Sequence, residues 1–399
     1  MNAGNQTTEP EIFDTVTKVG ERILSDIFGS PINFTDVQRL SEPDRRNSIL
    51  RCITVPTDNV PSTFIIKKVQ AEAYDPEDSS SWDTQRFFND WVGSKFLSSL
   101  EGDTNHGPHF YGGSRELGFI VLEDLGVHRS LVEPLLHGNT DSAKFALLRY
   151  STRLGKMHAD TVNRSDAYRK LFDSISSSRN SSAPTEQGLS ESVEKVKAIL
   201  ASLEVLSEPA FLQEMQEIVS AVLNPEPFLA YIHGDPCPDN VFDNIEQLRL
   251  IDFEFGRYSH ALIDATYARM LFPTCWCANR IPQSIIEEME NRYRMELIQG
   301  CPQAQENSVW EQALVNICGY WLLNTLSWHL EPALEEDRSW GIASVRQRIV
   351  ARLEAFVTTS EKFGYGSAIA GTAGSLLDTL NKRWIGTDSL PLYPAFQSE

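Results

Sequence analysis

The segment from Tyr231 to Gly256 constrains this chain more than any other part of its sequence. It reads as an apolar strand, a loop, a hairpin and a second apolar strand. Asp235 is followed five residues later by Asn240, and Asp252 stands at the end of the second strand. Phosphoryl transfer needs a group that orients the attacking hydroxyl and oxygen ligands for Mg²⁺. Two carboxylates and a carboxamide at these spacings therefore favour a phosphoryl-transfer site, whereas the alternative reading is a polar hairpin with ordinary turn carboxylates.

The same segment resembles the signature of a known family. His233-Gly234-Asp235, four residues and Asn240, followed later by Ile251-Asp252-Phe253-Glu254, are similar to the motif of the aminoglycoside phosphotransferase and choline kinase group. The resemblance covers roughly residues 33–335 and is sharp only over 231–256. It implies an α+β, two-lobed, protein-kinase-like fold, with a small antiparallel-sheet N-lobe and a larger, mainly helical C-lobe.

Composition limits the class of protein and its partners. A chain of 399 residues is long enough for two or three domain-sized units. The net charge of −20 argues against nucleic acid or an anionic membrane as partner. It would suit a cationic acceptor, but acidic cytosolic proteins are common. No stretch approaches the ~20 apolar residues of a membrane span, and the polar N-terminus does not read as a secretory signal, so we expect a cytoplasmic protein.

The six cysteines are scattered along the chain. In a cytoplasmic protein we expect them to be reduced and mostly buried. Cys275-Trp276-Cys277 is too tightly spaced for the usual zinc pair, and we predict neither a disulfide nor a metal site there. The alternatives for this run are core packing and an aromatic wall of the acceptor pocket.

Apolar periodicity and the resemblance together predict four regions. Residues 1–31 form a frayed tail and a helix, 32–125 the N-lobe, 126–384 the helical C-lobe with the catalytic loop and acceptor site, and 385–399 an extended surface tail. The helices are expected over 11–27, 82–100, 143–159, 190–206, 208–223, 260–271, 284–299, 310–330, 345–358 and 365–384. The strands are expected over 37–40, 48–55, 63–69, 109–112 and 118–123, and residues 164–188 are expected to be mostly polar loop.

Lys67 follows the apolar run Phe64-Ile65-Ile66 and matches the kinase lysine that holds the nucleotide phosphates. The other reading is that Lys67 and Lys68 are two solvated lysines at a strand end. The resemblance implies that Asp90, on the helix over 82–100, pairs with Lys67, although family members generally carry Glu there. Read by itself, Asp90 is a solvated helix acid.

The remaining nucleotide contacts come from the resemblance. The loop Leu40–Ser48 stands where kinases carry a glycine-rich phosphate loop, but it contains no glycine. Asn47 and Ser48 occupy positions at which family members often have polar side chains. The Glu123 carbonyl and the Leu125 amide correspond to the hinge that binds adenine, where spacing alone would indicate a fifth strand.

In the helical region the resemblance implies structural roles for two residues. His158 ends the helix over 143–159 and is expected to be structural. Asp264 lies where the family keeps an aspartate that braces the catalytic loop through backbone amides. The helices over 190–206 and 208–223 correspond to the variable part of the family that helps to form the acceptor pocket.

The predicted activity is transfer of the γ-phosphoryl group of ATP, or of GTP, to a hydroxyl of a small molecule. Asp235 is the predicted base, Asn240 and Asp252 the Mg²⁺ ligands, and Glu254 a contact of metal-bound water or acceptor. The alternative is a catalytically idle nucleotide-binding regulator, which the glycine-free loop and Asp90 favour. A protein acceptor is disfavoured because the Ala-Pro-Glu segment of protein kinases is missing. The sequence leaves the acceptor and the oligomeric state open.

Overall fold

The computed structural model describes residues 9–56, 59–70, 74–102, 105–127, 129–176, 183–244 and 246–397. The tail predicted at the N-terminus lies largely outside these residues. The chain divides into two compact units. The sheet unit comprises Met1–His128, Asp166–Ser181 and Arg249–Gly256, and the helical unit comprises Arg129–Ser165, Ser182–Leu248 and Arg257–Glu399.

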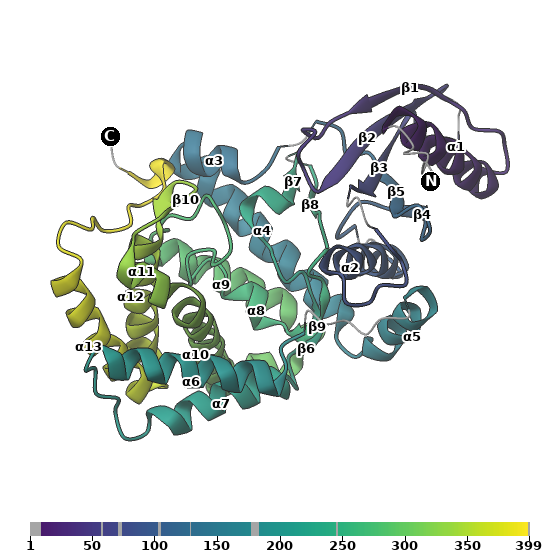
Figure 1. Ribbon diagram of the computed structural model, residues 1–399. Coiled ribbons are helices and arrows are strands. Elements are labelled where there is room, and N and C mark those ends of the chain that lie inside the picture. The colour runs from purple at the N-terminus through teal and green to yellow at the C-terminus, as the bar shows by residue number, and fades with distance from the viewer. Residues whose placement is uncertain are drawn as a thin grey trace. The chain divides into compact units, whose positions relative to one another are not determined.

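The sheet unit is built on a five-stranded antiparallel sheet with the strand order β1-β2-β3-β5-β4 (Figure 1). Its strands are β1 (Phe34–Arg39), β2 (Asn47–Thr54), β3 (Thr63–Val69), β4 (Phe110–Ser114) and β5 (Phe119–Glu123). Strands were predicted here from short β-like runs bounded by polar turns, and in the structure β2 and β3 largely alternate buried and partly exposed residues. The small antiparallel sheet of the predicted fold is therefore confirmed.

One helix covers each face of this sheet. Helix α1 (Glu9–Phe28) buries Val16 and Leu24 against one face, in a cluster that includes Ile66. Helix α2 (Trp82–Ser98) buries Phe87 and Phe88 against the other face. Successive side chains of a strand point to opposite faces. Because Ile66 points toward α1, Lys67 points toward α2, and this alternation positions the candidate site.

Helix α5 (Ser165–Ile175) was not predicted, since residues 164–188 read as a polar loop. Two aromatic residues account for the difference. Tyr168 and Phe172 are buried, and the Tyr168 ring meets Phe96 of α2 edge-on at a centroid distance of 5.4 Å. Tyr168, Leu171, Phe172 and Ile175 do recur at helical spacing, so the pattern was present in the sequence but was outweighed by the polar and serine-rich residues around it.

The helical unit contains most of the helices and three short strand pairs. The longer helices are α4 (Thr140–Thr161), α6 (Glu186–Ser202), α7 (Phe211–Leu223), α9 (Gln283–Leu297), α10 (Asn307–Thr325), α12 (Val345–Phe363) and α13 (Ser367–Arg383). The shorter ones are α3 (Val132–His137), α8 (Leu262–Ala265) and α11 (Glu331–Glu335), and a π-helical turn, Leu326–Leu330, continues α10. This unit confirms the predicted larger, mainly helical part.

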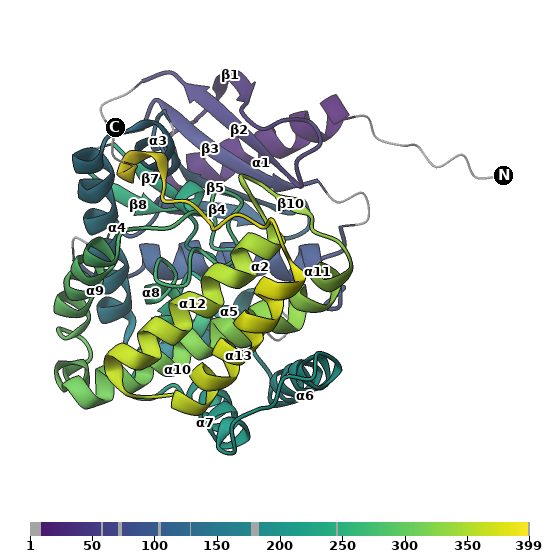
Figure 2. The same cartoon turned by 90° about the vertical axis from the view of Figure 1, so that its left-hand side faces the viewer.

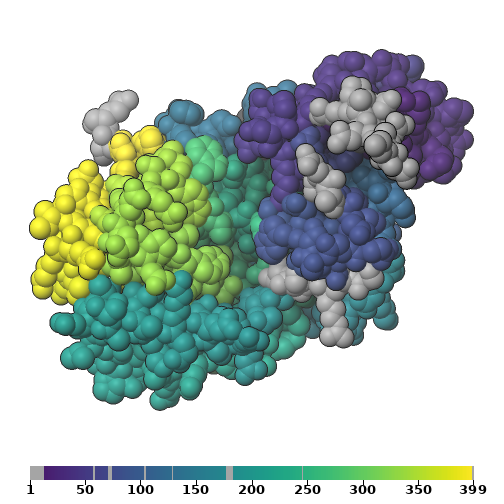
Figure 3. Space-filling view, in the orientation of Figure 1, coloured from purple at the N-terminus to yellow at the C-terminus, as the bar shows by residue number. Residues whose placement is uncertain are grey.

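The strand pairs of the helical unit are β6 (Leu229–Ile232) with β9 (Arg257–His260), β7 (Val241–Asp243) with β8 (Leu248–Leu250), and β10 (Ser339–Trp340) with β11 (Ala343–Ser344). The boundary between the two units falls inside β8. Helices α12 and α13 run side by side (Figure 2), and α6 and α7 form one surface of this unit (Figure 3). No helix among the described residues is long and apolar enough to cross a membrane.

Two predictions for this unit are corrected. The single helix expected over His260–Leu271 is instead the end of β9, the short helix α8 and a series of turns, because β9 pairs with β6. The tail expected to be extended over the surface packs inward. Tyr393 is fully buried, and its amide donates to the Arg280 carbonyl over 2.9 Å. The apolar residues of this tail could not be predicted to be buried from the sequence, because the surface on which they pack is formed by distant parts of the chain.

His260 of β9 gives the first testable prediction. Its ring stacks on Phe228 at a centroid distance of 5.0 Å, and burial lowers the pKa of His260 to about 3. The unfolded chain takes up this proton below its ordinary pKa of 6.5, whereas the folded chain does not. Stability is therefore lost as the pH falls from 6.5 toward 3, by roughly 2 kcal/mol at about pH 5.

Denaturant unfolding at several pH values measures this loss. In His260→Phe the drop in free energy of unfolding between neutral and acidic pH should be smaller than in the wild type. An equal drop in the two proteins would assign the acid sensitivity to other groups.

Candidate active site

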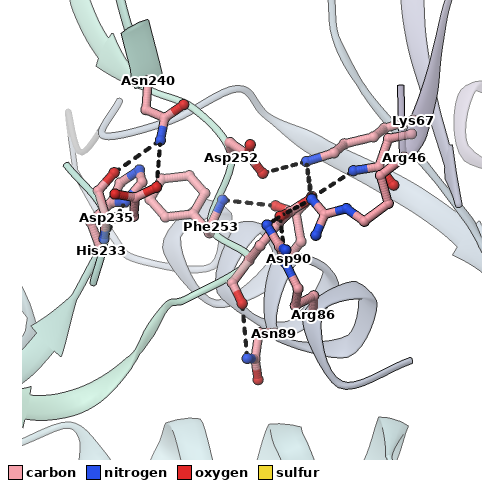
Figure 4. A network of polar contacts seen from close by, with 12 residues as sticks. Arg46, Lys67, Arg86, Asn89, Asp90, His233, Asp235, Asn240, Asp252 and Phe253 are labelled. Atoms are coloured by element: carbon pink, nitrogen blue, oxygen red, sulfur yellow. Dashed lines mark hydrogen bonds and ion pairs between the residues drawn. The ribbon is translucent and has the colours of Figure 1, made fainter. Parts of the chain in front are cut away.

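The centre of the candidate site in the sheet unit is the Lys67 ammonium group. Its Nζ lies 2.6 Å from Asp252 Oδ1, 2.7 Å from Asp90 Oδ2 and 3.4 Å from Glu254 Oε1 (Figure 4). Lys68, the alternative lysine, donates instead to the carbonyl of Val69. The structure thus brings together Lys67 and Asp90, the pair that the resemblance implied. Asp252 and Glu254, which follow strand β8, contact the same ammonium group.

Helix α2 holds the backbone of Phe253 and Glu254 through two neighbouring side chains. Asp90 uses both carboxylate oxygens, because Oδ1 accepts from the Phe253 amide over 3.0 Å while Oδ2 binds Lys67. Asn89 Nδ2 donates to the Glu254 carbonyl over 2.9 Å (Figure 4). Asp252, directly before these two anchored residues, has φ +69°, a region that residues other than glycine rarely adopt. The surrounding contacts stabilise this conformation, as is common at functional sites.

The charges in this cluster shift the pKa values of its members. Burial raises the pKa of Asp252 to about 7; Glu254 and Asp90 add to the rise, and Lys67 opposes it. Burial alone would lower the pKa of Lys67, but the three carboxylates raise it well above its usual value. Lys67 therefore stays charged, and Asp252 is held close to its titration point at neutral pH. A carboxylate perturbed by specific charged neighbours beside a pocket is a functional-site candidate.

Glu254 has charged partners that were not predicted from the sequence. It was expected to contact metal-bound water or acceptor, but it is only 3% exposed and is bound by cations. Arg86 Nε donates to its Oε2 over 2.9 Å, Arg46 also contacts Oε2, and Asn47 Nδ2 donates to Oε1 over 2.6 Å. Although burial would raise it, Lys67 and Arg46 lower the pKa of Glu254, so the carboxylate stays ionised.

A pocket opens at this cluster within the sheet unit. It is lined by Arg46, Asn47, Lys67, Val69, Asp83, Arg86, Phe87, Asp90, Ile120 and Glu254. The sequence analysis missed Arg46 and Arg86. The signal available for Arg46 was the pair Arg45-Arg46 in a loop where glycine is expected, whereas Arg86 lies on a helix that gave no signal.

The structure places three predicted nucleotide contacts away from this pocket. Ser48 points to the α1 face of β2, where it is fully buried and contacts Gln70. Glu123 ends β5, and its side chain accepts from the His109 amide over 3.0 Å and pairs with Arg249. Leu125 follows two residues after that strand. A role for Glu123 and Leu125 rests on backbone groups, as the resemblance implies.

The loop that carries Asp235 belongs to the helical unit and starts directly after β6. Asp264, which is 1% exposed, accepts from the His233 amide over 2.6 Å and from the Gly234 amide over 3.0 Å. His158 Nε2 lies 3.2 Å from the same carboxylate, and His158 Nδ1 lies 2.6 Å from the Tyr293 hydroxyl. The predicted brace at Asp264 and the structural role of His158 are confirmed.

Asn240 closes the Asp235 loop on itself. Its Nδ2 donates to the Asp235 carbonyl over 2.9 Å and lies 3.4 Å from Asp235 Oδ2 (Figure 4). The amide nitrogen is therefore engaged with the loop, and the carbonyl oxygen is the atom left for another partner. The opposite oxygen, Asp235 Oδ1, accepts from Tyr267 and Thr274, two residues that the sequence analysis did not select.

A disulfide joins Cys237 to Cys275 within the helical unit. This corrects the prediction that all cysteines are reduced and that Cys275 forms no disulfide. The two residues are 38 positions apart, so spacing in the sequence gave no indication of the pair. Cys52, Cys277, Cys301 and Cys318 are free and buried, as expected. Trp276 is 40% exposed, so this tryptophan is not a core residue.

The predicted metal ligands come from both units, Asn240 from the helical unit and Asp252 from the sheet unit. In the described part of the chain, no group of three or more His, Cys, Asp and Glu side chains is arranged to hold a metal ion.

Comparison with known proteins gives similarity at the level of structure. No protein-family model and no curated protein sequence matches the chain. A choline kinase from Cryptosporidium parvum Iowa II has 12% identity and a TM-score of 0.45, covering 86% of this chain and 93% of that chain. The ADP-bound aminoglycoside phosphotransferase APH(2'')-Ib has 15% identity and a TM-score of 0.45, covering 89% and 99%. The choline kinase LicA from Streptococcus pneumoniae has 15% identity and a TM-score of 0.40, covering 85% and 99%.

Proposed function

We propose that this protein transfers the γ-phosphoryl group of ATP or GTP to a hydroxyl group of a small molecule. The observation that carries the proposal is the cluster around Lys67, in which three carboxylates from separate parts of the sequence meet one buried lysine. Folding alone does not require such a cluster, because buried ion pairs seldom stabilise a protein more than apolar packing does.

The nucleotide phosphates would bind at the pocket of the sheet unit. Lys67 would anchor them, with Asp90 fixing the position of its ammonium group. Arg46 and Arg86 line the same pocket and present guanidinium groups, which bind phosphate oxygens in pairs. In this proposal the side chains of these arginines do the work that backbone amides of a glycine-rich loop do in other kinases.

The residues present fit Mg²⁺ by the chemistry of their donor atoms. Magnesium prefers oxygen ligands and is usually bound through one or two carboxylates and the phosphates of a substrate. Asp252 offers a carboxylate, and Asn240 offers a carbonyl oxygen because its amide nitrogen is engaged with the Asp235 loop. We assign these two residues as the ligands. The bound ion would neutralise charge on the phosphate oxygens.

Asp235 would accept a hydrogen bond from the acceptor hydroxyl and orient its oxygen toward the γ-phosphorus. As the new P–O bond forms and the bond to the leaving diphosphate breaks, the hydroxyl proton passes to the Asp235 carboxylate. The brace at Asp264 supports this role, since two backbone amides fix the loop at its start.

A second candidate function is nucleotide binding without transfer. The observation that favours it is that the cluster balances its own charges, with Lys67, Arg46 and Arg86 facing three carboxylates. A cluster satisfied in this way has less need of a ligand than one with an excess of either charge.

Transfer of label tests the proposal. The protein is incubated with γ-labelled ATP, and separately GTP, in a small-metabolite extract and with choline, ethanolamine, gentamicin and streptomycin, with Asp235→Asn as control. A labelled product that is absent with the variant supports a small-molecule kinase. Nucleotide binding with label found only as inorganic phosphate, or not transferred at all, supports the regulatory function.

The pocket also gives a prediction for Arg46. We expect Arg46→Ala to weaken MgATP binding by roughly 10- to 100-fold, because a hydrogen bond to a charged group contributes about 1.5–3 kcal/mol. Its neighbour Arg45 is exposed and does not line the pocket, so Arg45→Ala should change the affinity by no more than about twofold. Titration calorimetry measures both. Equal affinities of the two variants would remove Arg46 from the phosphate site.

A further inference from the structure

The proposed base is held on one side by two hydroxyl groups. Tyr267 Oη donates to Asp235 Oδ1 over 2.8 Å, and Thr274 Oγ1 also contacts Oδ1. The two hydroxyls contact each other as well. On the other oxygen, the nearest amide is Asn240 Nδ2 at 3.4 Å, beyond the usual length of an N–H···O bond. Asp235 thus has one oxygen that is fully engaged and one that is only weakly engaged.

Tyr267 is suited to act as a permanent donor. It is fully buried, and burial together with the nearby Asp235 charge raises its pKa well above its usual value. The phenol therefore keeps its proton at neutral pH and can donate it to a hydrogen bond. An ionised carboxylate only accepts hydrogen bonds, so both hydroxyl groups donate to it.

The segment Leu271–Cys277, which carries Thr274, has a conformation that the chain would not adopt by itself. Leu271 has φ +62° and Phe272 has φ +45°, and neither residue is glycine. Such residues are uncommon in this region and persist where surrounding contacts determine them. Helix α12 contacts the backbone on both sides of these two residues, at Met270 and at Pro273.

Two arginines of α12 hold the backbone of this segment. Arg348 and Arg352 are each 1% exposed, and their guanidinium groups donate to backbone carbonyls. The acceptors are the carbonyls of Cys275 at 2.7 Å and Trp276 at 2.9 Å for Arg348, and of Pro273 at 3.0 Å and Met270 at 3.2 Å for Arg352. Burial lowers the pKa of Arg348 to about 10 and that of Arg352 to about 9. Burying two cations is costly, which indicates that the position of this segment matters.

The disulfide then joins the segment to the base. Cys275 follows Thr274, Cys237 is two residues after Asp235, and the two Cα atoms are 5.6 Å apart. The covalent link therefore ties the residue next to Thr274 to the loop that carries the base.

We propose that Thr274 and Tyr267 are positioning residues that hold Oδ1 of Asp235, so that Oδ2 is presented to the acceptor hydroxyl, and that the Cys237–Cys275 disulfide keeps Thr274 in place. This inference rests on the proposed function. A carboxylate that is free to rotate presents its oxygens in many directions, and misplacement of a reacting group by about 1 Å can cost a factor of about 100 in rate.

Three substitutions test the role of Thr274. Thr274→Val removes the hydroxyl at nearly constant volume and should lower kcat roughly 10- to 100-fold, with the Kd for MgATP unchanged. Thr274→Ser restores a hydroxyl and should recover most of the lost kcat. Thr266→Val is the matched control, because the buried Thr266 hydroxyl donates to the Leu262 carbonyl and does not touch Asp235. Equal kcat values for the Val and Ser variants at position 274 would overturn the assignment.

Reduction tests the role of the disulfide. A dithiol reductant supplies two electrons and two protons, so that the S–S bond breaks, two thiols form and the reductant itself becomes a disulfide. Reduction should lower kcat of the wild type and leave that of Thr274→Val unchanged, because both changes release the same contact. The same fractional loss in the two proteins would show that the disulfide does not act through Thr274.

A measurement without turnover separates this inference from the proposed function. Hydrogen exchange at residues 233–241 should be faster in Thr274→Val than in the wild type and Thr274→Ser, while Thr266→Val should leave this loop protected. If no acceptor is phosphorylated, the proposed function fails, and the exchange result still decides whether Thr274 positions the loop. Unchanged protection in Thr274→Val would overturn the inference.

Discussion

Asp235→Asn is expected to lower the rate of phosphoryl transfer by a factor of about 10² to 10⁴, the range that general base catalysis contributes. The substitution keeps the shape of the side chain and the oxygen that accepts from Tyr267. It removes the negative charge that orients and deprotonates the acceptor hydroxyl. Because the nucleotide pocket is lined by residues of the sheet unit, the affinity for MgATP should be nearly unchanged. Initial rates of label transfer and titration calorimetry measure the two quantities.

Asp239→Asn is the matched control for this prediction. Asp239 lies in the same loop, but its carboxylate accepts from Trp276 Nε1 over 2.9 Å, a contact that an asparagine side chain can also make. We expect its rate to stay within about twofold of the wild type. An Asp235→Asn variant as active as the Asp239→Asn variant would mean that Asp235 is not the base.

Lys67→Met has the second-largest expected effect and acts on both binding and stability. Three carboxylates would lose the buried cation that they share, so the free energy of unfolding should fall by roughly 3 kcal/mol. The affinity for MgATP should fall by more than about tenfold, since the phosphates lose a charged partner. Asp252, whose pKa is already raised to about 7, would take up a proton more readily, so the loss of stability should increase with pH across neutrality.

Lys68→Met provides the comparison, because Lys68 carries the same charge one residue later and, within the described part of the chain, donates to the Val69 carbonyl. Its unfolding free energy and MgATP affinity should stay close to those of the wild type. Denaturant unfolding and calorimetry on the two variants give the answer. Similar losses in both would show that the effect of Lys67→Met does not depend on the cluster around Lys67.

Local patterns in the sequence accounted for much of the fold. Short β-like runs bounded by polar turns located β2 and β3 to within a residue or two at each end and put Lys67 directly after the apolar run of its strand. Helical periodicity located α2, α4 and most of the later helices. The patterns failed for α5 and β9, which are stabilised by partners distant in sequence, Phe96 and β6 respectively.

The candidate site divides in the same way. The motif of Asp235, Asn240 and Asp252 is a matter of spacing along the chain, and the resemblance supplied Lys67, Asp90 and the brace at Asp264. The spacing of residues along the chain gives no information about side chains that other helices and loops bring to the site. The arginines around Glu254 and the hydroxyls on Asp235 were for that reason found only in the structure.

The sequence by itself determined which residue types are available for phosphoryl transfer, because the spacing of a motif along the chain does not depend on how the chain folds. Only the tertiary structure decided how their charges are compensated. Lys67 could be told from Lys68 because it directly follows the apolar run of its strand, but the pKa of Asp252 depends on three neighbours from different elements. Likewise, Cys237 and Cys275 are 38 residues apart, and only folding brings their sulfur atoms together. Electrostatic and covalent contacts depend on distance in space, which sequence separation does not give.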